Sequence, residues 1–281
     1  MQMHAMKKIK LMFFVLILLT LQNCETNPPT TPDYGAGKIY LTIKLDPSEN
    51  ISAATKIVLL EDFANVSCVP CVQSNKIIES LTRHTYGPSK LVAVKFPTDF
   101  PSPSDPFYLA KSDYCDGRMN FYNIFFAPTT IIDGTLRPIS TDSIAVKAAI
   151  EQRLITEARF EIIVTDSIFS ENYFVNISLK LVNTTGLNLD EIVMHTIMTE
   201  TDIEFETPPG SNGETKFYDV MRDMLPSDSG ELVSRIIQEG EINYEFSNAL
   251  GTDWVLANLN TVAYIQNVGT KEVYQSGSTF N

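Results

Sequence analysis

The short motif Cys68-Val69-Pro70-Cys71 constrains the fold of this chain more than any other feature. It follows an apolar, β-branched run over 57–63 that predicts a buried strand, and it precedes 72–83, whose apolar residues recur at helical spacing. Two cysteines about one helical turn apart can form a disulfide, and Pro70 suits a first helical turn because it needs no backbone donor. At a helix start, unpaired N–H groups and the helix dipole favour a thiolate. Cys68 could therefore attack a disulfide, and Cys71 could resolve the mixed disulfide that forms.

The residues after the motif continue an alternation of strands and helices. Residues 91–96 predict a strand, 97–106 a Pro- and Ser-rich loop, and 107–122 a helix. Ala127-Pro128-Thr129 then leads into a short strand over 130–133, and Asp133-Gly134 predicts a turn and a hairpin. A last helix is predicted from Thr141 or Asp142, either of which can cap it, through Glu157.

This order of elements around a Cys-x-Pro-Cys motif resembles the thioredoxin-like superfamily over residues 56–158. The resemblance implies that Pro128 is a cis-proline beside the disulfide, which with Ala127 and Thr129 helps to bind extended substrate backbone. It also implies that Asp62, six positions before Cys68, is a buried acid that accepts the proton of the resolving thiol. Ser67 stands where thioredoxins usually carry tryptophan, which leaves substrate choice open.

Beyond residue 158 the pattern changes to that of an all-β protein. Strands are predicted over 159–165, 173–183, 191–200, 254–266 and 271–275, with one helical insertion over 231–238. We therefore expect an α/β thioredoxin-like domain over 56–158 and an all-β, immunoglobulin-like sandwich over 159–281, with Trp254 in the sandwich core. The acidic, Gly- and Pro-rich stretch 204–214 is predicted to be a solvated loop, although long surface loops also make contacts.

The N-terminus has the layout of a bacterial export signal. Residues 1–23 hold a basic segment followed by an apolar run from Leu11 to Leu21, which is short for a membrane span. Leu21-Gln22-Asn23-Cys24 resembles a lipobox, in which Cys24 would be acylated, although Asn23 departs from the small residue usual there. A chance cysteine after an apolar leader is the alternative. Residues 24–55 are expected to be a lipid-anchored tether, with a strand over 38–45.

Taken whole, the chain is similar to bacterial outer-membrane lipoproteins that pair a thioredoxin-like domain with a β-sandwich. The resemblance implies that the protein is located in the cell envelope and held there by a lipid anchor. We expect the anchor in the outer membrane, on either its periplasmic or its surface face. It implies architecture more than activity.

Charge and the remaining reactive residues narrow the function further. The net charge of −13 becomes −16 once Lys7, Lys8 and Lys10 leave with the signal, which argues against a nucleic-acid partner. A second ligand pair at zinc-site spacing is missing, so no metal site is predicted. Cys115 lies on an apolar helical stripe and is expected to be a buried, inert thiol, with a regulatory or intermolecular role as the alternative. His84 and His195 are interpreted as an ordinary helix-end and strand residue.

Two functions follow. The first is an envelope thiol–disulfide oxidoreductase with Cys68 as nucleophile, Cys71 as resolving thiol and Asp62 as proton acceptor. It needs no external cofactor, only protein thiol or disulfide substrates or a redox partner. The second is a non-catalytic binding module in which the Cys68–Cys71 disulfide is structural and the β-rich half recognises a protein or glycan. The residues determine neither the direction of electron transfer nor the oligomeric state.

Overall fold

A computed structural model of the 281-residue chain describes residues 40–41, 54–234, 236 and 240–280. The predicted signal segment, Cys24 and most of the predicted tether lie outside these residues. The helical elements are α1 (Cys71–Glu79), a π-helical turn (Ser80–Tyr86), α2 (Pro106–Ala110), α3 (Ser112–Tyr122), α4 (Ser143–Leu154) and two 3-10 turns (Leu189–Glu191 and Leu256–Asn258). The strands are β1 (Tyr40–Leu41), β2 (Val58–Ala64), β3 (Leu91–Pro97), β4 (Thr129–Ile132), β5 (Phe160–Phe169), β6 (Asn172–Leu181), β7 (Ile192–Glu200), β8 (Ile203–Glu204), β9 (Lys216–Phe217), β10 (Val220–Leu225), β11 (Glu231–Leu232), β12 (Glu241–Ala249), β13 (Leu259–Asn267) and β14 (Val273–Ser278).

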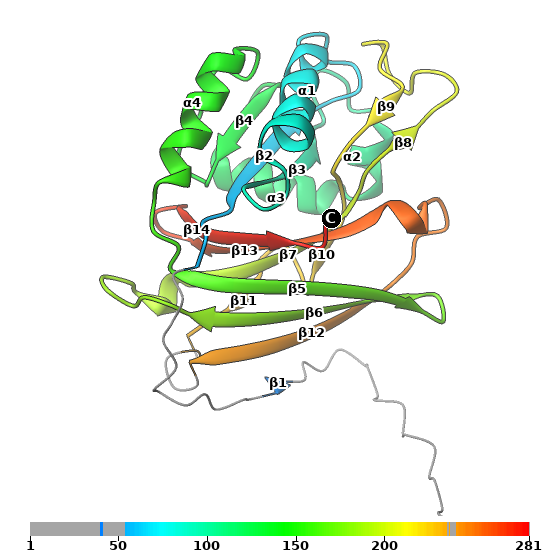
Figure 1. Ribbon diagram of the computed structural model, residues 1–281. Coiled ribbons are helices and arrows are strands. Elements are labelled where there is room, and N and C mark those ends of the chain that lie inside the picture. Colours follow the sequence, from blue (N-terminus) through cyan, green and yellow to red (C-terminus); the bar gives the residue numbers. More distant parts are fainter. Residues whose placement is uncertain (1–39, 42–53, 235, 237–239, 281) are drawn as a thin grey trace, which may run out of the picture. The chain divides into compact units, whose positions relative to one another are not determined.

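A large mixed sheet forms the centre of the fold (Figure 1). Its strand order is β14-β13-β7-β10-β3-β2-β4, and β11 adds to the edge of β7. β3 lies parallel to β2 and to β10, whereas the other neighbouring pairs are antiparallel. The protein is therefore mixed α/β, with further antiparallel sheets and few helices.

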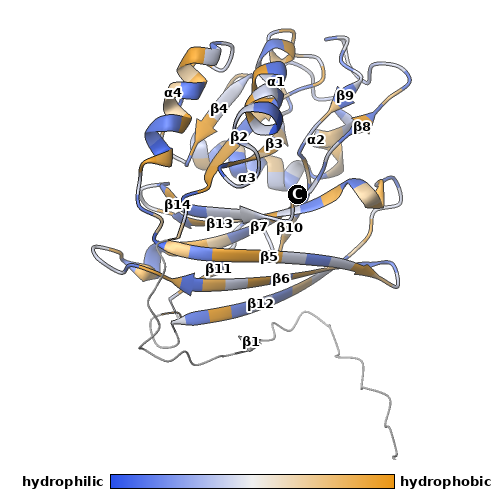
Figure 2. Cartoon of the chain, in the orientation of Figure 1, coloured by the Kyte–Doolittle hydropathy of each residue, from blue (hydrophilic) through white to orange (hydrophobic). Residues whose placement is uncertain are grey.

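Helices cover both faces of the β2–β3–β4 part of this sheet. α1 and α4 pack on one face around Leu60, Ile78 and Ile150, and α3 packs on the other around Leu59 and Met119. Because both faces are covered, all seven residues of β2 are buried: five are apolar, and the charges of Glu61 and Asp62 are paired with Arg118 and Lys95. Figure 2 shows this as hydrophobic colour along β2 and β4 beneath helices of mixed colour.

A second, antiparallel sheet packs on the β7–β13 part of the mixed sheet. Its strand order is β1-β12-β6-β5. Alternate residues of β6 and β12, such as Val175, Ile177 and Ile242, face Met194 and Ala263 of the mixed sheet in one apolar core. All nine residues of β7 are buried because this core covers one of its faces and the α3 side covers the other.

The predicted boundary near residue 158 falls where α4 gives way to β5. Strands from both sides of that point nevertheless pair directly: β3 pairs with β10, with Lys95 opposite Val220. The described residues from Tyr40 to Phe280 group as one compact unit. A division at 158 into separate domains stays a prediction.

Several elements differ from those predicted. The helix over 107–122 is two helices, because Lys111 leaves the helical conformation with φ −148° and ψ 48°. Sequence reasoning missed β10 and β12. β10 was hidden because Arg222 and Asp223 interrupt its apolar run, and both charges are buried in ion pairs. The helix expected over 231–238 is wrong at its start, where Glu231–Leu232 pair with β7 as a strand.

The turn at Asp133-Gly134 is confirmed, with φ of 44° and 73°, but the hairpin is reduced to a single bridge between Ile132 and Leu136. Gly134 is needed there because a Cβ would lie 1.7 Å from the carbonyl oxygen of Lys271. Within the described part of the chain, no helix is both long and apolar enough to span a bilayer.

Candidate functional site

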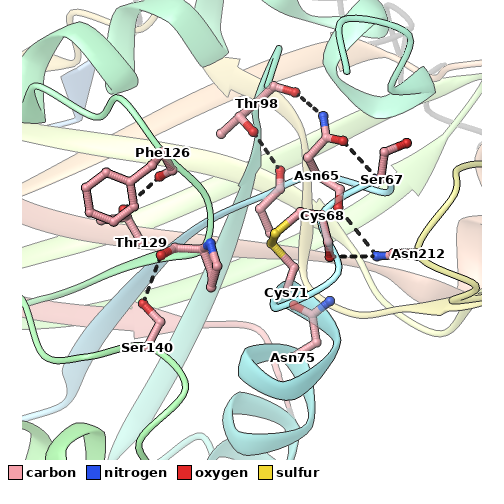
Figure 3. Close-up of a disulfide and its surroundings, with 12 residues drawn as sticks. Asn65, Ser67, Cys68, Cys71, Asn75, Thr98, Phe126, Thr129, Ser140 and Asn212 are labelled. Atoms are coloured by element: carbon pink, nitrogen blue, oxygen red, sulfur yellow. Dashed lines mark hydrogen bonds between the residues drawn. A yellow bond between two sulfur atoms is a disulfide. The ribbon is translucent and has the colours of Figure 1, made fainter. Parts of the chain in front are cut away.

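Cys68 and Cys71 form a disulfide at the end of β2, with their Cα atoms 5.3 Å apart (Figure 3). The helix begins at Cys71 and not at Cys68, because residues 68–70 form a turn first, in which the Cys71 amide donates to the Cys68 carbonyl over 3.1 Å. Pro70 is the residue that caps the helix. Both cysteines are nearly inaccessible, at 2% and 0% exposure, whereas Val69 between them is 70% exposed.

Asp62 is buried on β2, and the registers of three strands determine its surroundings. It pairs with Lys95 on β3 and with Thr130 on β4. The Lys95 ammonium lies 3.0 Å from the Asp62 carboxylate, and the Thr130 hydroxyl donates to it over 3.4 Å. Lys95 also donates to the side-chain oxygen of Asn75 on α1. Sequence reasoning missed Lys95, although a single lysine within the apolar run of β3 was a usable signal.

Ala127, Pro128 and Thr129 approach the disulfide from another element. The Ala127–Pro128 peptide bond is cis, and Ala127 packs in one cluster with Ala64, Cys68 and Cys71. The Ser140 hydroxyl donates to the carbonyl of Pro128, and the Thr129 hydroxyl donates to the carbonyl of Phe126 (Figure 3). The cysteines and Ala127 are thus brought together. The substrate-binding role of these three residues stays a prediction.

Two buried polar residues hold the loop that leads into Cys68. The Asn65 amide donates to the carbonyls of Thr98 and Ser102 over 2.6 and 2.9 Å, and its oxygen accepts from the backbone of Ser67. Asp105 accepts from the backbone N–H of Val66 and also caps α2. Burial raises the pKa of the Asp105 carboxyl above its usual range, and its hydrogen bonds oppose that rise. Neither residue was predicted, because their partners are distant in sequence or belong to the backbone.

The stretch 204–214 was expected to be a solvated loop that could also make contacts; its residues are exposed or half-buried, and it reaches the cysteine loop. The Asn212 side chain donates to the Cys68 carbonyl over 3.4 Å (Figure 3). Glu214 accepts two hydrogen bonds from Asn75, both of 2.9 Å. This contact brings the C-terminal half of the chain to the disulfide. Three apolar side chains near these residues in sequence are exposed to solvent. Val69 lies within the motif, and Phe125 and Phe126, which are 79% and 60% exposed, lie just before Ala127 and Pro128.

The other residues weighed from sequence lie away from the disulfide's contacts. Cys115 of α3 is buried in the apolar cluster between this helix and the sheet, as expected, and it is a free thiol. Burial raises the pKa of this thiol. His84 is exposed in the π-helical turn after α1. His195 is buried on β7 with its ring against Tyr264. Trp254 packs, partly buried, against the core between the two large sheets.

Comparison with known proteins gives likeness of fold. No family model matches the chain, and no curated protein matches it in sequence. Among solved structures, HBP35 of Porphyromonas gingivalis is 13% identical with a TM-score of 0.67, covering 80% of this chain and 75% of that one. A protein of Agrobacterium tumefaciens is 11% identical with a TM-score of 0.51, covering 82% and 95%.

A domain of the outer membrane lipoprotein Omp28 from Porphyromonas gingivalis is 19% identical, covering 43% of this chain and 86% of that domain. Its TM-score is 0.30, so nothing is inferred from it. At these identities the first two structures indicate a shared fold, and they carry no information about activity.

Proposed function

We propose that this chain is a cell-envelope lipoprotein that exchanges disulfides with protein substrates through Cys68 and Cys71. In this proposal residues 56–158 are thioredoxin-like, residues 159–281 form an immunoglobulin-like sandwich, and Cys24 carries the lipid that attaches the chain to a membrane, with the outer membrane expected. No external cofactor is needed, because the cysteine pair itself carries two electrons.

One observation carries the proposal. The Cys68–Cys71 disulfide lies at a strand-to-helix junction, and it packs against Ala127, which precedes Pro128. The same β2 strand that leads into Cys68 holds a buried acid, Asp62, with a cation beside it. This buried carboxylate is the group to which the exchange mechanism assigns the proton of the resolving thiol.

The exchange step balances without further reactants. A substrate thiolate attacks Sγ of Cys68, the Cys68–Cys71 bond breaks, and the electron pair leaves on Cys71. The Cys71 thiolate takes up a proton. A second substrate thiolate then displaces Cys68 from the mixed disulfide, so that the substrate loses two electrons and the protein gains them. In the reverse direction, Asp62 accepts the proton of Cys71 as Cys71 attacks the mixed disulfide.

The decisive experiment uses the chain with Cys24 replaced by serine, so that it is soluble without lipid. We expect the oxidised protein to oxidise a reduced test protein, or the reduced protein to reduce insulin, and Cys68→Ala to abolish this. Cys115→Ala is the matched control, since it removes a cysteine outside the disulfide and should retain activity. Equal activity of the Cys68→Ala variant and the parent would refute the proposal.

The alternative is a non-catalytic lipoprotein in which the disulfide is structural and the β-rich half binds a partner. The near-complete burial of both cysteines favours it, because an exchanging sulfur has to be reached. The reduction potential separates the two. A structural disulfide is expected below about −300 mV, and known oxidoreductases lie between about −270 and −120 mV.

A further inference from the structure

The segment 203–217, which we call the arm, is anchored beside the cysteine loop by an apolar cluster. β8 and β9 pair at its base, and Phe217 packs edge-on against Phe107 with ring centroids 5.2 Å apart. Val66, two residues before Cys68, belongs to the same cluster. This packing holds the base of the arm against the loop that leads into Cys68, and Figure 1 shows β8 and β9 beside α2.

The tip of the arm lies directly on the backbone of the cysteine loop. The backbone N–H of Asn212 donates to the Val66 carbonyl over 3.2 Å, and the backbone N–H of Ser211 donates to the Ser67 hydroxyl over 3.2 Å. Gly210 is so close that a Cβ there would lie 2.3 Å from the Val66 carbonyl oxygen. Only glycine allows this approach without movement of one of the two segments.

The side chain of Asn212 connects the arm to Cys68 itself. Its Nδ2 donates to the Cys68 carbonyl over 3.4 Å and to the Glu214 carboxylate over 2.7 Å, and it lies 3.5 Å from the Asn65 carbonyl. Its Oδ1 accepts from the Glu214 backbone N–H over 2.9 Å, which fixes the amide in this orientation. The Cys68 carbonyl thus has two donors, Asn212 and the Cys71 N–H.

Glu214 extends the contact to the resolving side of the disulfide. Both of its oxygens accept from Asn75, which lies four residues after Cys71 and so on the same face of α1. Because the Asn75 nitrogen is bound to Glu214, its oxygen points to Lys95, which in turn lies 3.0 Å from Asp62. A chain of polar contacts therefore runs from the Cys68 carbonyl through the arm to Asp62.

We propose that Asn212 and Glu214 are positioning residues through which the C-terminal half sets the thiol–disulfide equilibrium and the pH profile of the cysteine pair. This rests on the proposed exchange function only for its biological purpose. The arm holds the loop in the geometry of the closed disulfide. Two thiols cannot approach as closely as two bonded sulfurs, so reduction moves the loop and weakens contacts made to it. The arm then favours the oxidised form.

The first test is equilibrium with glutathione, in which two glutathione thiols supply two electrons and two protons, the Cys68–Cys71 bond breaks, and glutathione disulfide forms. Removing one hydrogen bond made mainly in the oxidised form should shift the equilibrium constant toward the dithiol about 3- to 10-fold in Asn212→Ala. Asn212→Ser, which can retain the turn to Glu214 but not the reach to Cys68, should shift it similarly. Ser211→Ala is the matched control, because its exposed side chain is not used.

Gly210→Ala tests the same idea without removing a polar group. Its methyl group would push the tip away from Val66, and we expect the same direction of shift as in Asn212→Ala. Circular dichroism verifies that each variant is folded before titration. Constants for Asn212→Ala and Gly210→Ala within twofold of the Ser211→Ala value would overturn the proposal.

The second test concerns Glu214. Glu214→Gln removes a negative charge from the group of residues that includes Lys95 and Asp62, which should favour thiolates and move the pH profile of exchange with glutathione to lower pH. Glu206→Gln, an exposed carboxylate of the same arm, is the control and should leave the profile unchanged. Equal profiles for the two variants would contradict the role of Glu214.

These outcomes differ from failure of the proposed function. A protein that exchanges with no protein substrate still has a measurable glutathione equilibrium, and the arm variants can still shift it. Conversely, if the protein is active and its equilibrium constant with glutathione is unchanged by the arm variants, the proposed function stands and the role of the arm is refuted.

Discussion

Asp62 and Lys95 occupy paired positions on the parallel strands β2 and β3, and the ammonium of Lys95 lies 3.0 Å from the Asp62 carboxylate. Their side chains are 1% and 12% exposed. A buried pair of this kind contributes little net stability when intact, but removing one partner strands the other charge in a medium of low polarity. The pair therefore permits separate tests of stability and of proton transfer.

For stability, Lys95→Met should lower the free energy of unfolding by about 3 kcal/mol, because it leaves Asp62 buried without a counter-ion. The double variant Asp62→Asn/Lys95→Met should recover most of that loss, since no charge remains. Urea denaturation of the two single variants and the double variant measures the coupling. Additive losses in the double variant would show that the two groups do not stabilise each other.

For activity, Asp62→Asn should slow exchange at neutral pH about 100-fold, because it removes the proposed proton acceptor. The double variant that recovers stability should not recover the rate. Stopped-flow measurement of mixed-disulfide resolution gives the relevant step. A double variant as fast as the parent would assign Asp62 a structural role only.

A second buried ion pair lies in the N-terminal half of the chain, and its arginine also contacts the C-terminal half. Arg118 of α3 lies 2.5 Å from Glu61 of β2, donates to Gln266 of β13, and stacks near the rings of Phe121 and Tyr122. Arg118→Met should lower the free energy of unfolding by about 3 to 5 kcal/mol, measured in urea, because Glu61 is fully buried.

The matched control for Arg118→Met is Lys147→Met, whose ion pair with Glu151 is exposed and spans 3.8 Å. That change should cost less than about 0.5 kcal/mol. Similar losses in the two variants would mean that burial of the Arg118 pair has no energetic consequence.

His195 should make stability depend on pH. Burial holds its pKa well below the ordinary value, and the Arg118 guanidinium adds to this, with the Tyr264 ring packed against it. Below about pH 6.5 this histidine binds a proton in the unfolded chain but stays neutral in the folded protein. The free energy of unfolding should then fall by about 1.4 kcal/mol per pH unit, until the pH reaches the depressed pKa.

Urea titrations at pH 7.5 and 5.5 measure this effect. His195→Gln should lose that component of the slope, whereas His84→Gln, at an exposed position, should keep it. A parent protein with the same pH dependence as His195→Gln would refute the prediction.

Cys115 should not react in the folded protein, because burial raises the pKa of its thiol and the side chain is inaccessible. In the oxidised Cys24→Ser chain, an aromatic disulfide reagent should titrate no thiol under native conditions and one in guanidinium chloride. Cys115→Ala should titrate none in either condition. Rapid reaction of the native protein would instead support the regulatory alternative for this cysteine.

Much of the local structure around the disulfide could be predicted. The strand into Cys68, the helix after it, the turn at Asp133-Gly134 and the burial of Cys115 depend on neighbours within one strand or a few helical turns. Asp62 could be singled out only through the resemblance to thioredoxin-like proteins, which implies an acid six positions before the first cysteine. By contrast, β10 was missed because Arg222 and Asp223 pair their charges with Glu200 on the neighbouring strand β7 and with Lys111, which is 112 positions away.

The sequence by itself determined where the cysteine pair lies and which elements flank it, because periodicity and the spacing of Cys68 and Cys71 are local properties. Only the tertiary structure decided what surrounds the pair. Asn75 and Glu214 are 139 positions apart, and Asn212 meets Cys68 across 144. Such contacts follow from strand register and from the packing of the arm, and no local pattern encodes them. The same long-range pairing joined β3 to β10, so that one sheet serves both halves of the chain.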